Sequence, residues 1–381
     1  MTRITTKSRR PSLAAGDYVR WFVIGCAVGL FVLWSQALAV GGWTGLLHVS
    51  HDSPLRSFIA SEIPDLVILD VQNDGQISYA VASDPWGESL PDKVPQAPLR
   101  WRRFLFPALA GMLGIIDGLP LFWSMVGWLT LSFGVATMAL RSILDKLGAS
   151  VWGMIGLLAH PGVWMGLRIM TPDPMGMALA LTGTALVLRR RDGIGLLALS
   201  LAVIAKEPYL LFAAALGAWR FFGGERKRGL LLFLMPTTTL ALWTVVMAAV
   251  VPGSYFESPN SALPFLGIIE ASGSWPSIEP RQNLYTGLTA LILVAGVVVA
   301  LRVRNNFVRW HLAAWVSQAL ITSEAVWRYG NANLRAFAPI GIFIGVALAL
   351  PPGAGQDLPK TPPTGSGRQA VGPGDPTEER A

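Results

Sequence analysis

Long apolar stretches recur along most of the chain and are separated by short polar segments. The stretches are continuous, whereas the strands of a membrane barrel are shorter and alternate between apolar and polar positions. A helix needs about twenty mostly apolar residues to cross the hydrocarbon core of a bilayer. We therefore expect an all-α, polytopic transmembrane protein with about ten spans. The expected spans are residues 19–42, 119–140, 149–167, 174–188, 193–205, 208–222, 229–251, 284–301, 307–323 and 335–350.

Composition favours a membrane protein over a soluble one. Of the 381 residues, 52% are hydrophobic and 14% are charged, whereas about a quarter of the residues in a soluble domain are charged. The net charge of +7 could indicate a nucleic-acid partner. However, the basic residues lie at the ends of the expected spans, as membrane topology predicts. We therefore expect the lipid bilayer as a partner and no nucleic acid.

The polar segments divide the chain into three parts. Residues 1–18 form a basic N-terminus, and residues 19–350 form the transmembrane domain. Residues 43–118 form a long first loop, whose apolar stretch 103–117 is short for a span and is expected to lie as a helix on the membrane surface. Residues 351–381 are rich in Pro, Gly and polar side chains. They cannot bury enough apolar surface to fold, so we expect a disordered tail.

The distribution of Lys and Arg orients the expected spans. With residues 103–117 on the surface, 20 of the 30 Lys and Arg residues fall on the side of the N-terminus and 10 on the other side. Cytoplasmic loops carry the excess of positive charge. The pattern predicts a multi-pass protein of the cell (plasma or inner) membrane, with both termini cytoplasmic and the first loop extracytoplasmic.

The first candidate site lies in the expected first loop, in the run NDGQ over residues 73–76, which is followed by Tyr79 and Asp84. Gly75 permits a tight backbone turn that would expose the carboxylate of Asp74. That carboxylate could act as a general base toward a hydroxyl group or hold a divalent cation. The alternative is an ordinary turn with a solvated acid, because such turns are common.

The second candidate site is the basic run Arg100, Arg102 and Arg103, which comes just before the expected surface helix. The guanidinium group of arginine matches the geometry of phosphate oxygens. The alternative is an anchor that binds ordinary anionic lipid, with Trp101 at the depth of the headgroups.

Lys206 and Glu207 form the third candidate, because they interrupt an apolar stretch that would otherwise run from residue 193 to 222. One helix of that length would hold two charges in hydrocarbon, which is costly. Two short spans that meet at an extracytoplasmic turn avoid this cost, with Pro208 at the start of the second helix. The charged pair could line a polar cavity, or it could be a structural ion pair at the turn.

Two further polar clusters fall on the same side of the expected topology. The first holds Glu324, Arg328, Tyr329, Asn331 and Arg335, and the four-residue spacing of Glu324 and Arg328 permits a helical ion pair. The second is the turn RIMTPDP over residues 168–174, which could also be a plain connection. Together, the clusters supply carboxylates and cations that suit a lipid-linked donor bearing a phosphate.

The sequence also resembles a known superfamily of membrane enzymes. The run NDGQISYAVASDP, followed by PLRWRRFLFPALA, is similar to a pattern in bacterial polytopic proteins of the GT-C glycosyltransferase superfamily. Lys206 and Glu207 after a short span, and the late cluster of Glu324, Tyr329, Asn331 and Arg335, are similar to that group as well. One departure is Ile77-Ser78, where the pattern would have an aromatic residue beside Tyr79.

The resemblance implies transfer of a sugar from a polyprenyl-phosphate carrier to an extracytoplasmic acceptor, which could be a glycan, a lipid or a protein, during formation of a cell-surface glycopolymer. It implies that Asp74 is the catalytic base, with Asp84 in reserve. No cofactor is expected with certainty, and dependence on a divalent metal stays open. The residues expected to bind the substrates are Gln76, Tyr79, Arg100, Arg102, Arg103, Lys206, Glu207, Glu324, Arg328, Tyr329, Asn331 and Arg335.

Two other functions are compatible with the same residues. A transporter or flippase of lipid-linked sugars would use the cations without a catalytic carboxylate, but such a protein would favour charges deep in its spans. A non-catalytic membrane subunit would need neither the cations nor Asp74 for chemistry.

Overall fold

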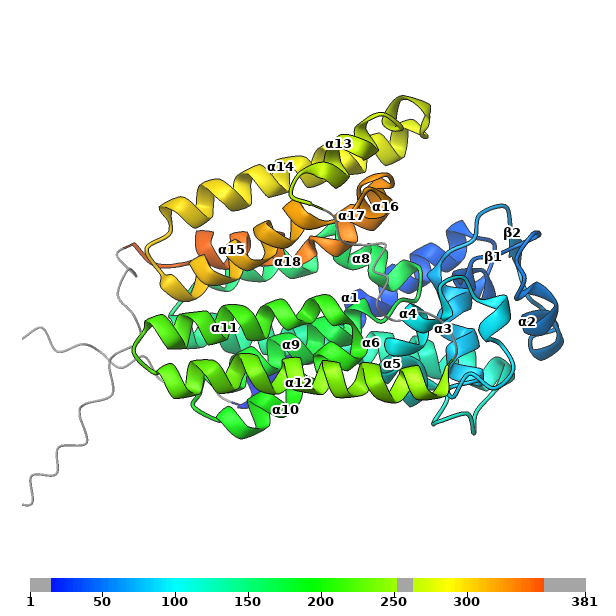
Figure 1. Cartoon of the computed structure of the whole chain (residues 1–381), viewed down its shortest axis with the longest axis horizontal. Coiled ribbons are helices and arrows are strands. Elements are labelled where there is room, and N and C mark those ends of the chain that lie inside the picture. The colour runs from blue at the N-terminus through cyan, green and yellow to red at the C-terminus, as the bar shows by residue number, and fades with distance from the viewer. Residues whose placement is uncertain (1–14, 252–262, 353–381) are drawn as a thin grey trace, which may run out of the picture.

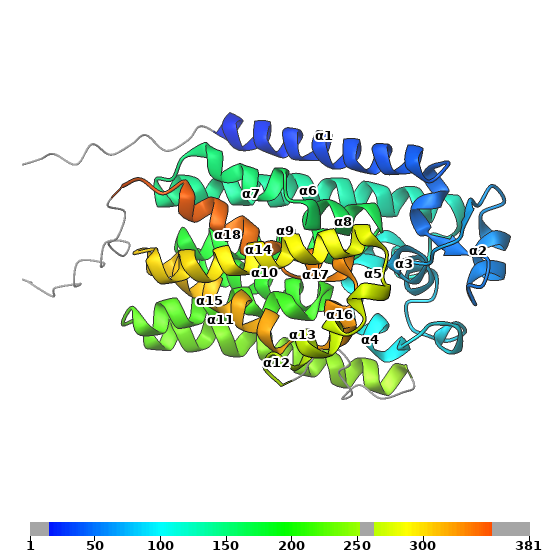
Figure 2. The same cartoon turned by 90° about the horizontal axis from the view of Figure 1, so that it is seen from above.

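The computed structural model describes residues 15–251 and 263–352, in which long helices lie side by side with their axes roughly parallel (Figures 1 and 2). The first loop gathers at one end of this bundle, which we call the loop end. The described chain begins and ends at the opposite end, which we call the tail end. The predictions for residues 1–14 and for 353–381 lie outside the described residues.

Within the described residues, four helices are long and apolar enough to cross a membrane, and a fifth candidate is a pair of helices bent by 48°. The four are α1 (Ala15–Ala39), α6 (Gly118–Leu147), α12 (Arg226–Val250) and α14 (Pro280–Arg302), and the bent pair is α17 (Gly330–Ala336) with α18 (Ala338–Leu348). Large apolar side chains of α1, α12 and α14 point away from the protein, as expected of helices that contact lipid. The chain is therefore an all-α membrane protein, as predicted.

The other expected spans coincide with helices that are shorter or interrupted. These helices are η3 (Val151–Met154), α7 (Ile155–Leu158), α8 (Pro161–Arg168), α9 (Asp173–Leu188), α10 (Asp192–Ala205), η4 (Glu207–Tyr209), α11 (Leu210–Phe222) and α15 (Asn306–Ile321). The stretch from 149 to 167 is broken where Pro161 starts a new helix. Residues 193–222 form two helices joined by η4, as the position of Lys206 and Glu207 predicted.

Small residues let the first two long helices approach each other closely. A β-carbon added to Gly25 of α1 would lie 2.5 Å from Thr137 Oγ1 of α6, and one added to Gly134 would lie 2.4 Å from the sulfur of Cys26. Close approach of this kind is the usual way in which helices pack in a membrane, because burial of apolar side chains drives little association there. This contact fixes α1, and with it the start of the first loop, against the bundle.

Aromatic side chains form the centre of the other half of the bundle. Phe212 of α11 lies within 6 Å of the rings of His311 and Trp315 on α15 and of Phe343 on α18. Tilted and edge-to-face arrangements like these are favourable between aromatic rings. They hold together helices whose loop ends carry Lys206 and Arg335.

Short elements replace the mixed polar loop that was expected over residues 43–101. They are η1 (Trp43–Leu47), β1 (Val49–Ser50), α2 (Arg56–Glu62), β2 (Ile68–Leu69), α3 (Asp74–Ser83), η2 (Pro91–Lys93) and α4 (Ala97–Arg102). The two strands pair in parallel, with Val49 opposite Ile68. This segment is therefore a folded cap on the loop end, packed on the bundle through α3 (Figure 1).

The helix expected over residues 103–117 is much shorter in the structure. Helix α5 covers Leu105–Ala110, and the chain then turns through Met112, Leu113 and Gly114, all of which have positive φ angles. Gly111 follows the last residue of α5 and has no room for a side chain, because a β-carbon there would lie 2.3 Å from the carbonyl oxygen of Ala82. The large apolar side chains of the turn are nevertheless exposed.

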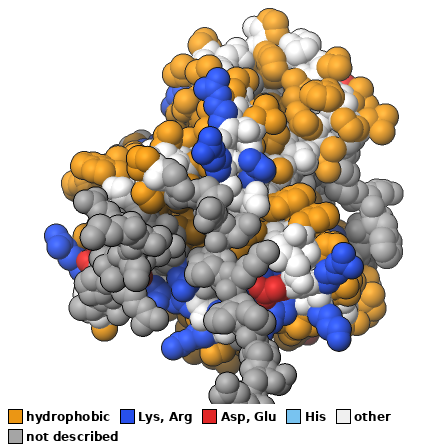
Figure 3. Space-filling view, turned by 90° about the vertical axis from the view of Figure 1, so that its left-hand side faces the viewer, with side chains coloured by type: hydrophobic (Ala, Val, Ile, Leu, Met, Phe, Trp, Pro, Cys, Tyr) orange, Lys and Arg blue, Asp and Glu red, His pale blue; other side chains and the backbone are white. Residues whose placement is uncertain are grey.

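The last short helices lie near the loop end as well. They are α13 (Leu266–Ser272), η5 (Trp275–Ser277) and α16 (Glu324–Trp327). Figure 3 looks at the opposite, tail end, where Lys and Arg side chains are scattered among apolar ones and few acids are visible.

Candidate functional site

Asp74 is the first residue of α3, so the turn expected at Asn73-Asp74-Gly75 is instead the start of a helix. Asn73 fixes this start through two contacts with His48, in which the Asn73 backbone N–H donates to the His48 carbonyl oxygen and the side chains meet at 3.2 Å. Gly75 has room for no side chain, because a β-carbon would lie 2.8 Å from the carbonyl oxygen of Leu46. The glycine therefore serves close packing, which sets the position of the neighbouring Asp74.

Two arginines from distant parts of the chain hold the carboxylate of Asp74. Arg100 of α4 donates to Oδ1 at 2.9 Å, and Arg335 of α17 donates to Oδ2 at 3.0 Å. These residues are 26 and 261 positions away from Asp74 in the sequence. The structure therefore brings together three residues that the sequence analysis placed in three different polar clusters.

A second carboxylate extends this ion-pair chain. Asp173, the first residue of α9, accepts hydrogen bonds from Lys206 Nζ and from the hydroxyl of Thr171. Arg335 Nε lies 3.6 Å from Asp173 Oδ2, so Arg335 links the two carboxylates. The backbone carbonyl of Asp173 also accepts from the hydroxyl of Tyr209, which ties α9 to the turn that carries Lys206.

Glu207 forms a separate ion-pair group with the remaining arginines of the cap. Its two carboxylate oxygens accept from Arg102 Nε at 2.9 Å and from Arg103 Nε at 3.0 Å. One interpretation of the sequence was an ion pair between the adjacent residues Lys206 and Glu207. The structure does not contain this pair. Instead they bind opposite charges on different elements, which attaches the cap to the turn between α10 and α11.

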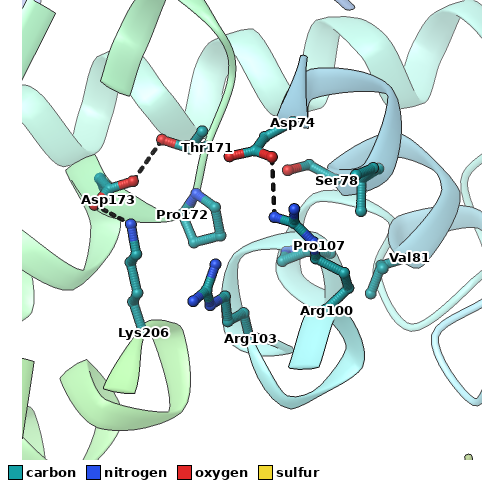
Figure 4. Close-up of a pocket in the computed structure, with 11 residues that line it drawn as sticks. Asp74, Ser78, Val81, Arg100, Arg103, Pro107, Thr171, Pro172, Asp173 and Lys206 are labelled. Atoms are coloured by element: carbon teal, nitrogen blue, oxygen red, sulfur yellow. Dashed lines mark hydrogen bonds and ion pairs between the residues drawn. The ribbon is translucent and has the colours of Figure 1, made fainter. Parts of the chain in front are cut away.

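A cavity lies between these two groups, with an empty volume of about 320 Å³. In Figure 4 the side chains of Arg103 and Lys206 point into the space between α9 and α3. We call it the basic cavity, and its lining residues are Asp74, Ile77, Ser78, Val81, Arg100, Arg103, Pro107, Thr171, Pro172, Asp173 and Lys206.

The helical period of α3 explains which of its side chains reach the basic cavity. Residues 74, 77, 78 and 81 all line it, and they follow the spacing that places side chains on one face of a helix. The charged group thus comes from α3 and α4 on one side and from the starts and ends of α9, α10 and α17 on the other.

Cations outnumber acids in both ion-pair groups. Arg100, Arg335 and Lys206 face Asp74 and Asp173, which leaves one positive charge in excess. The second group has two arginines for the single carboxylate of Glu207, which leaves another. Within the described residues, Arg100 Nε and Arg335 Nε are buried without a hydrogen-bond acceptor. Buried donors usually have a partner, so the site is suited to an anion.

Burial and charge act in opposite directions on the groups of this site. Burial by itself would raise the pKa of Asp74, but the positive charges of Arg100 and Arg335, with smaller effects of Arg103 and Lys206, hold it well below its usual range. Burial lowers the pKa of Lys206 to about 8, even though Asp173 favours its charged form. Asp74 is therefore ionised at neutral pH, whereas Lys206 can lose its charge in mildly alkaline solution.

Three predicted site residues of the cap have structural contacts instead of a place in the basic cavity. Asp84, the reserve base, accepts from the backbone N–H groups of residues 88, 89 and 90 and so holds its own loop. Tyr79 is fully buried and donates to the carbonyl oxygen of Gly118. Gln76 accepts from the hydroxyl of Ser53. Asp74 thus remains the only candidate base of the two that were predicted.

Most of the late polar cluster does not reach the basic cavity either. Glu324 and Arg328 form the expected helical ion pair, and the side chain of Arg328 is 43% exposed. Tyr329 is exposed, and the backbone N–H of Asn331 donates to Gln282 Oε1. From this cluster, Arg335 alone joins the charged site.

Asp173 and Thr171 are the site residues that the sequence did not single out for a role. The prolines on both sides of Asp173 indicate a turn. A turn, however, does not predict which charged residues form ion pairs with Asp173. Only the fold brings Asp173 to Lys206, 33 residues further along the chain.

The site shows no obvious place for a metal ion. Over residues 15–251 and 263–352, no three or more His, Cys, Asp and Glu side chains gather in a group that could bind one. Comparison with known proteins gives no further guidance, since no protein-family model, no curated protein and no solved structure matches the chain.

Proposed function

We propose that the protein is a membrane glycosyltransferase that moves a sugar from a polyprenyl-phosphate donor to a hydroxyl group of an acceptor outside the cytoplasm. The observation that carries the proposal is the carboxylate of Asp74 on the wall of a cavity with surplus positive charge. The resemblance of residues 73–85 and 98–110 to GT-C glycosyltransferases supports the same function.

The proposed topology has about ten crossings, with the loop end extracytoplasmic. It is supported by the excess of Lys and Arg among segments at the tail end. In this orientation the exposed apolar turn after α5 lies at the outer membrane surface, and the polyprenyl chain lies among the apolar helices with its phosphate in the basic cavity.

In the proposed reaction, the cations bind the donor and Asp74 accepts a proton. Arg100, Arg103 and Lys206 bind the donor phosphate. The bond between the sugar anomeric carbon and the phosphate oxygen breaks, and its electron pair stays on that oxygen. The acceptor oxygen forms the new bond to the anomeric carbon and gives its proton to Asp74. The leaving phosphate gains one negative charge, which the surplus cations stabilise.

Without a substrate, the ion pairs make Asp74 a weak base, because both of its oxygens are bound to arginine. A phosphate group in the basic cavity competes with Asp74 for Arg100, which lines that cavity. As Arg100 turns to the phosphate, the pKa of Asp74 rises toward its usual value and the carboxylate can accept a proton. Binding of the donor would thus activate the base.

The proposal is tested by replacing Asp74 with asparagine, which keeps its size and removes the charge. The host gene is deleted and restored with the wild type, with Asp74→Asn or with Asp70→Asn, and surface glycans and polyprenyl-linked sugars are measured by mass spectrometry. Asp70 is a suitable control because it is an exposed acid of the same cap without a hydrogen bond or an ion pair within the described residues.

We expect Asp74→Asn to insert normally but to lose transfer by about a hundredfold or more. The lipid-linked donor should then accumulate, while Asp70→Asn should restore the normal glycan profile. A normal profile with Asp74→Asn would refute the role of the base and would favour a transporter or a non-catalytic subunit.

A further inference from the structure

A second cavity lies on the other side of the Asp74–Arg100 ion pair. Its empty volume is about 660 Å³, and it shares Asp74, Ile77 and Arg100 with the basic cavity. We call it the amide cavity, because the side chains of Gln72, Asn73 and Gln76 line it. Asp74 thus lines two cavities.

The two cavities follow two faces of the cap around α3. Residues 74, 77, 78 and 81 line the basic cavity, whereas residues 72, 73 and 76 line the amide cavity. The basic cavity is also lined by residues 171–173 and by Lys206 of the bundle. Among the described residues, those that line the amide cavity all lie between Ser53 and Arg100, within the cap.

The lining of the amide cavity is polar and carries one cation without a counter-ion. Lys93 lies on its wall and is exposed, and its ammonium group makes no hydrogen bond or ion pair within the described residues. The amide nitrogen of Gln76 also has no acceptor there, since the contact with Ser53 uses the Gln76 oxygen. No aromatic side chain lines this cavity, so a ligand would be recognised by hydrogen bonds and charge.

We infer that the amide cavity binds the acceptor, and that the acceptor is a hydroxyl-bearing molecule with an anionic group, such as a phosphate, that pairs with Lys93. The amide groups then hold the hydroxyls, and one hydroxyl reaches Asp74 from the side opposite the donor. The identification of this ligand as the acceptor rests on the proposed function. Binding of the ligand itself depends only on the cavity.

The inference is tested by equilibrium binding to the full-length protein in phosphatidylcholine nanodiscs, without a sugar donor. The probes are glucose 6-phosphate, glucose and inorganic phosphate. The variants are Lys93→Gln in the amide cavity, Lys206→Gln in the basic cavity and Lys146→Gln as a matched control. Lys146 is an exposed lysine at the tail end with no ion pair within the described residues.

We expect glucose 6-phosphate to bind the wild type more tightly than glucose does. Lys93→Gln should weaken glucose 6-phosphate binding about fivefold, as loss of one exposed charge contact would do, while Lys146→Gln should leave it unchanged. Binding of inorganic phosphate should depend on Lys206 instead, because Lys206 is a cation that lines the basic cavity.

Three results would overturn the inference. They are no binding of glucose 6-phosphate to the wild type, equal affinity for glucose and glucose 6-phosphate, or a loss of binding with Lys206→Gln but not with Lys93→Gln. The proposed function fails in a different way, namely if Asp74→Asn supports normal transfer in the host, so the two failures can be told apart.

A second arm identifies the source of the anionic group. The binding measurement is repeated in nanodiscs that also contain phosphatidylglycerol, a lipid with a hydroxylated anionic headgroup. If the natural ligand is a lipid headgroup, phosphatidylglycerol should weaken the apparent affinity of the wild type for glucose 6-phosphate but not that of Lys93→Gln. If the ligand is a soluble glycan, the affinity should be the same in both nanodiscs.

Discussion

The loop end and the tail end both carry networks of arginines and acids, but the two networks differ in burial. At the tail end, Glu225 binds Arg190, Arg220 and Arg228, and the side chain of Arg228 is 55% exposed. At the loop end, no side chain of the ion pairs around the basic cavity is more than 21% exposed.

The surroundings of the two networks differ as well. Five charged residues of the loop-end network line the basic cavity, whereas no charged residue of the described chain lines the large cavity near the tail end, which is lined mainly by glycines and apolar side chains such as Trp152 and Ile344. Exposed ion pairs contribute little free energy and lose strength in salt. Buried cations that exceed their counter-ions carry a desolvation cost, which an anionic ligand can offset. The comparison thus separates charges that suit a ligand from charges that suit the membrane surface.

The strongest test of this comparison replaces one arginine at each end. Arg335→Gln removes a cation shared by Asp74 and Asp173, and we expect transfer to fall by about a hundredfold. Arg189→Gln removes a cation that binds Asp145 and Tyr18 at the tail end. It should lower the stability by no more than about 1 kcal/mol and leave transfer nearly unchanged.

Both variants should be measured in proteoliposomes with a polyprenyl-phosphate sugar, with thermal unfolding followed in parallel. Equal losses of transfer in the two variants would contradict the distinction between the ends.

A second test uses the pKa of Lys206. Burial lowers this pKa to about 8, so the ammonium group becomes neutral as the pH rises above that value. The charged and titratable groups that act on it are Asp173, Arg335 and Arg103. We expect kcat/KM for the donor to fall about tenfold for each pH unit above the pKa, because phosphate binding needs the cation.

Lys206→Arg provides the control for this pH dependence, because a guanidinium group stays charged throughout the range. The variant should lack the alkaline fall, even if its overall rate is lower. If kcat/KM falls equally with pH in the wild type and in Lys206→Arg, the fall is caused by a group other than Lys206. Titration of Asp74 should not lower kcat/KM in mildly acidic solution, since its pKa lies well below the usual range.

The sequence was sufficient to predict the helical membrane fold because apolar length is a local property. It also pointed to Asp74, Arg100 and Arg335, because charges beside apolar helices are unusual. It could not predict that the cap is folded, since its short helices are stabilised by packing on α6 and α12 rather than by their own pattern.

Ion-pair partners were the least predictable feature of the site. Neighbours in sequence, such as Lys206 and Glu207, bind different elements, and Asp173 gains its role only from residues on α10 and α17. For the same reason, Asp84 looked like a candidate base, although the backbone of its own loop occupies both of its oxygens. The partners of a charge depend on the tertiary structure, which one sequence does not contain.

The smallest effect is expected for Arg328, and it allows a comparison of two arginines that both lie at the loop end. Arg328 was predicted to bind phosphate, but it pairs with Glu324 on its own helical turn and is 43% exposed. If burial beside the basic cavity, rather than location at the loop end, makes a cation functional, Arg328→Gln should keep transfer within about twofold of the wild type. The measurement is the same proteoliposome assay, with Arg335→Gln beside it. A loss as large as that of Arg335→Gln would mean that the phosphate site extends to α16, and that the side chain of Arg328 turns from Glu324 to the donor on binding.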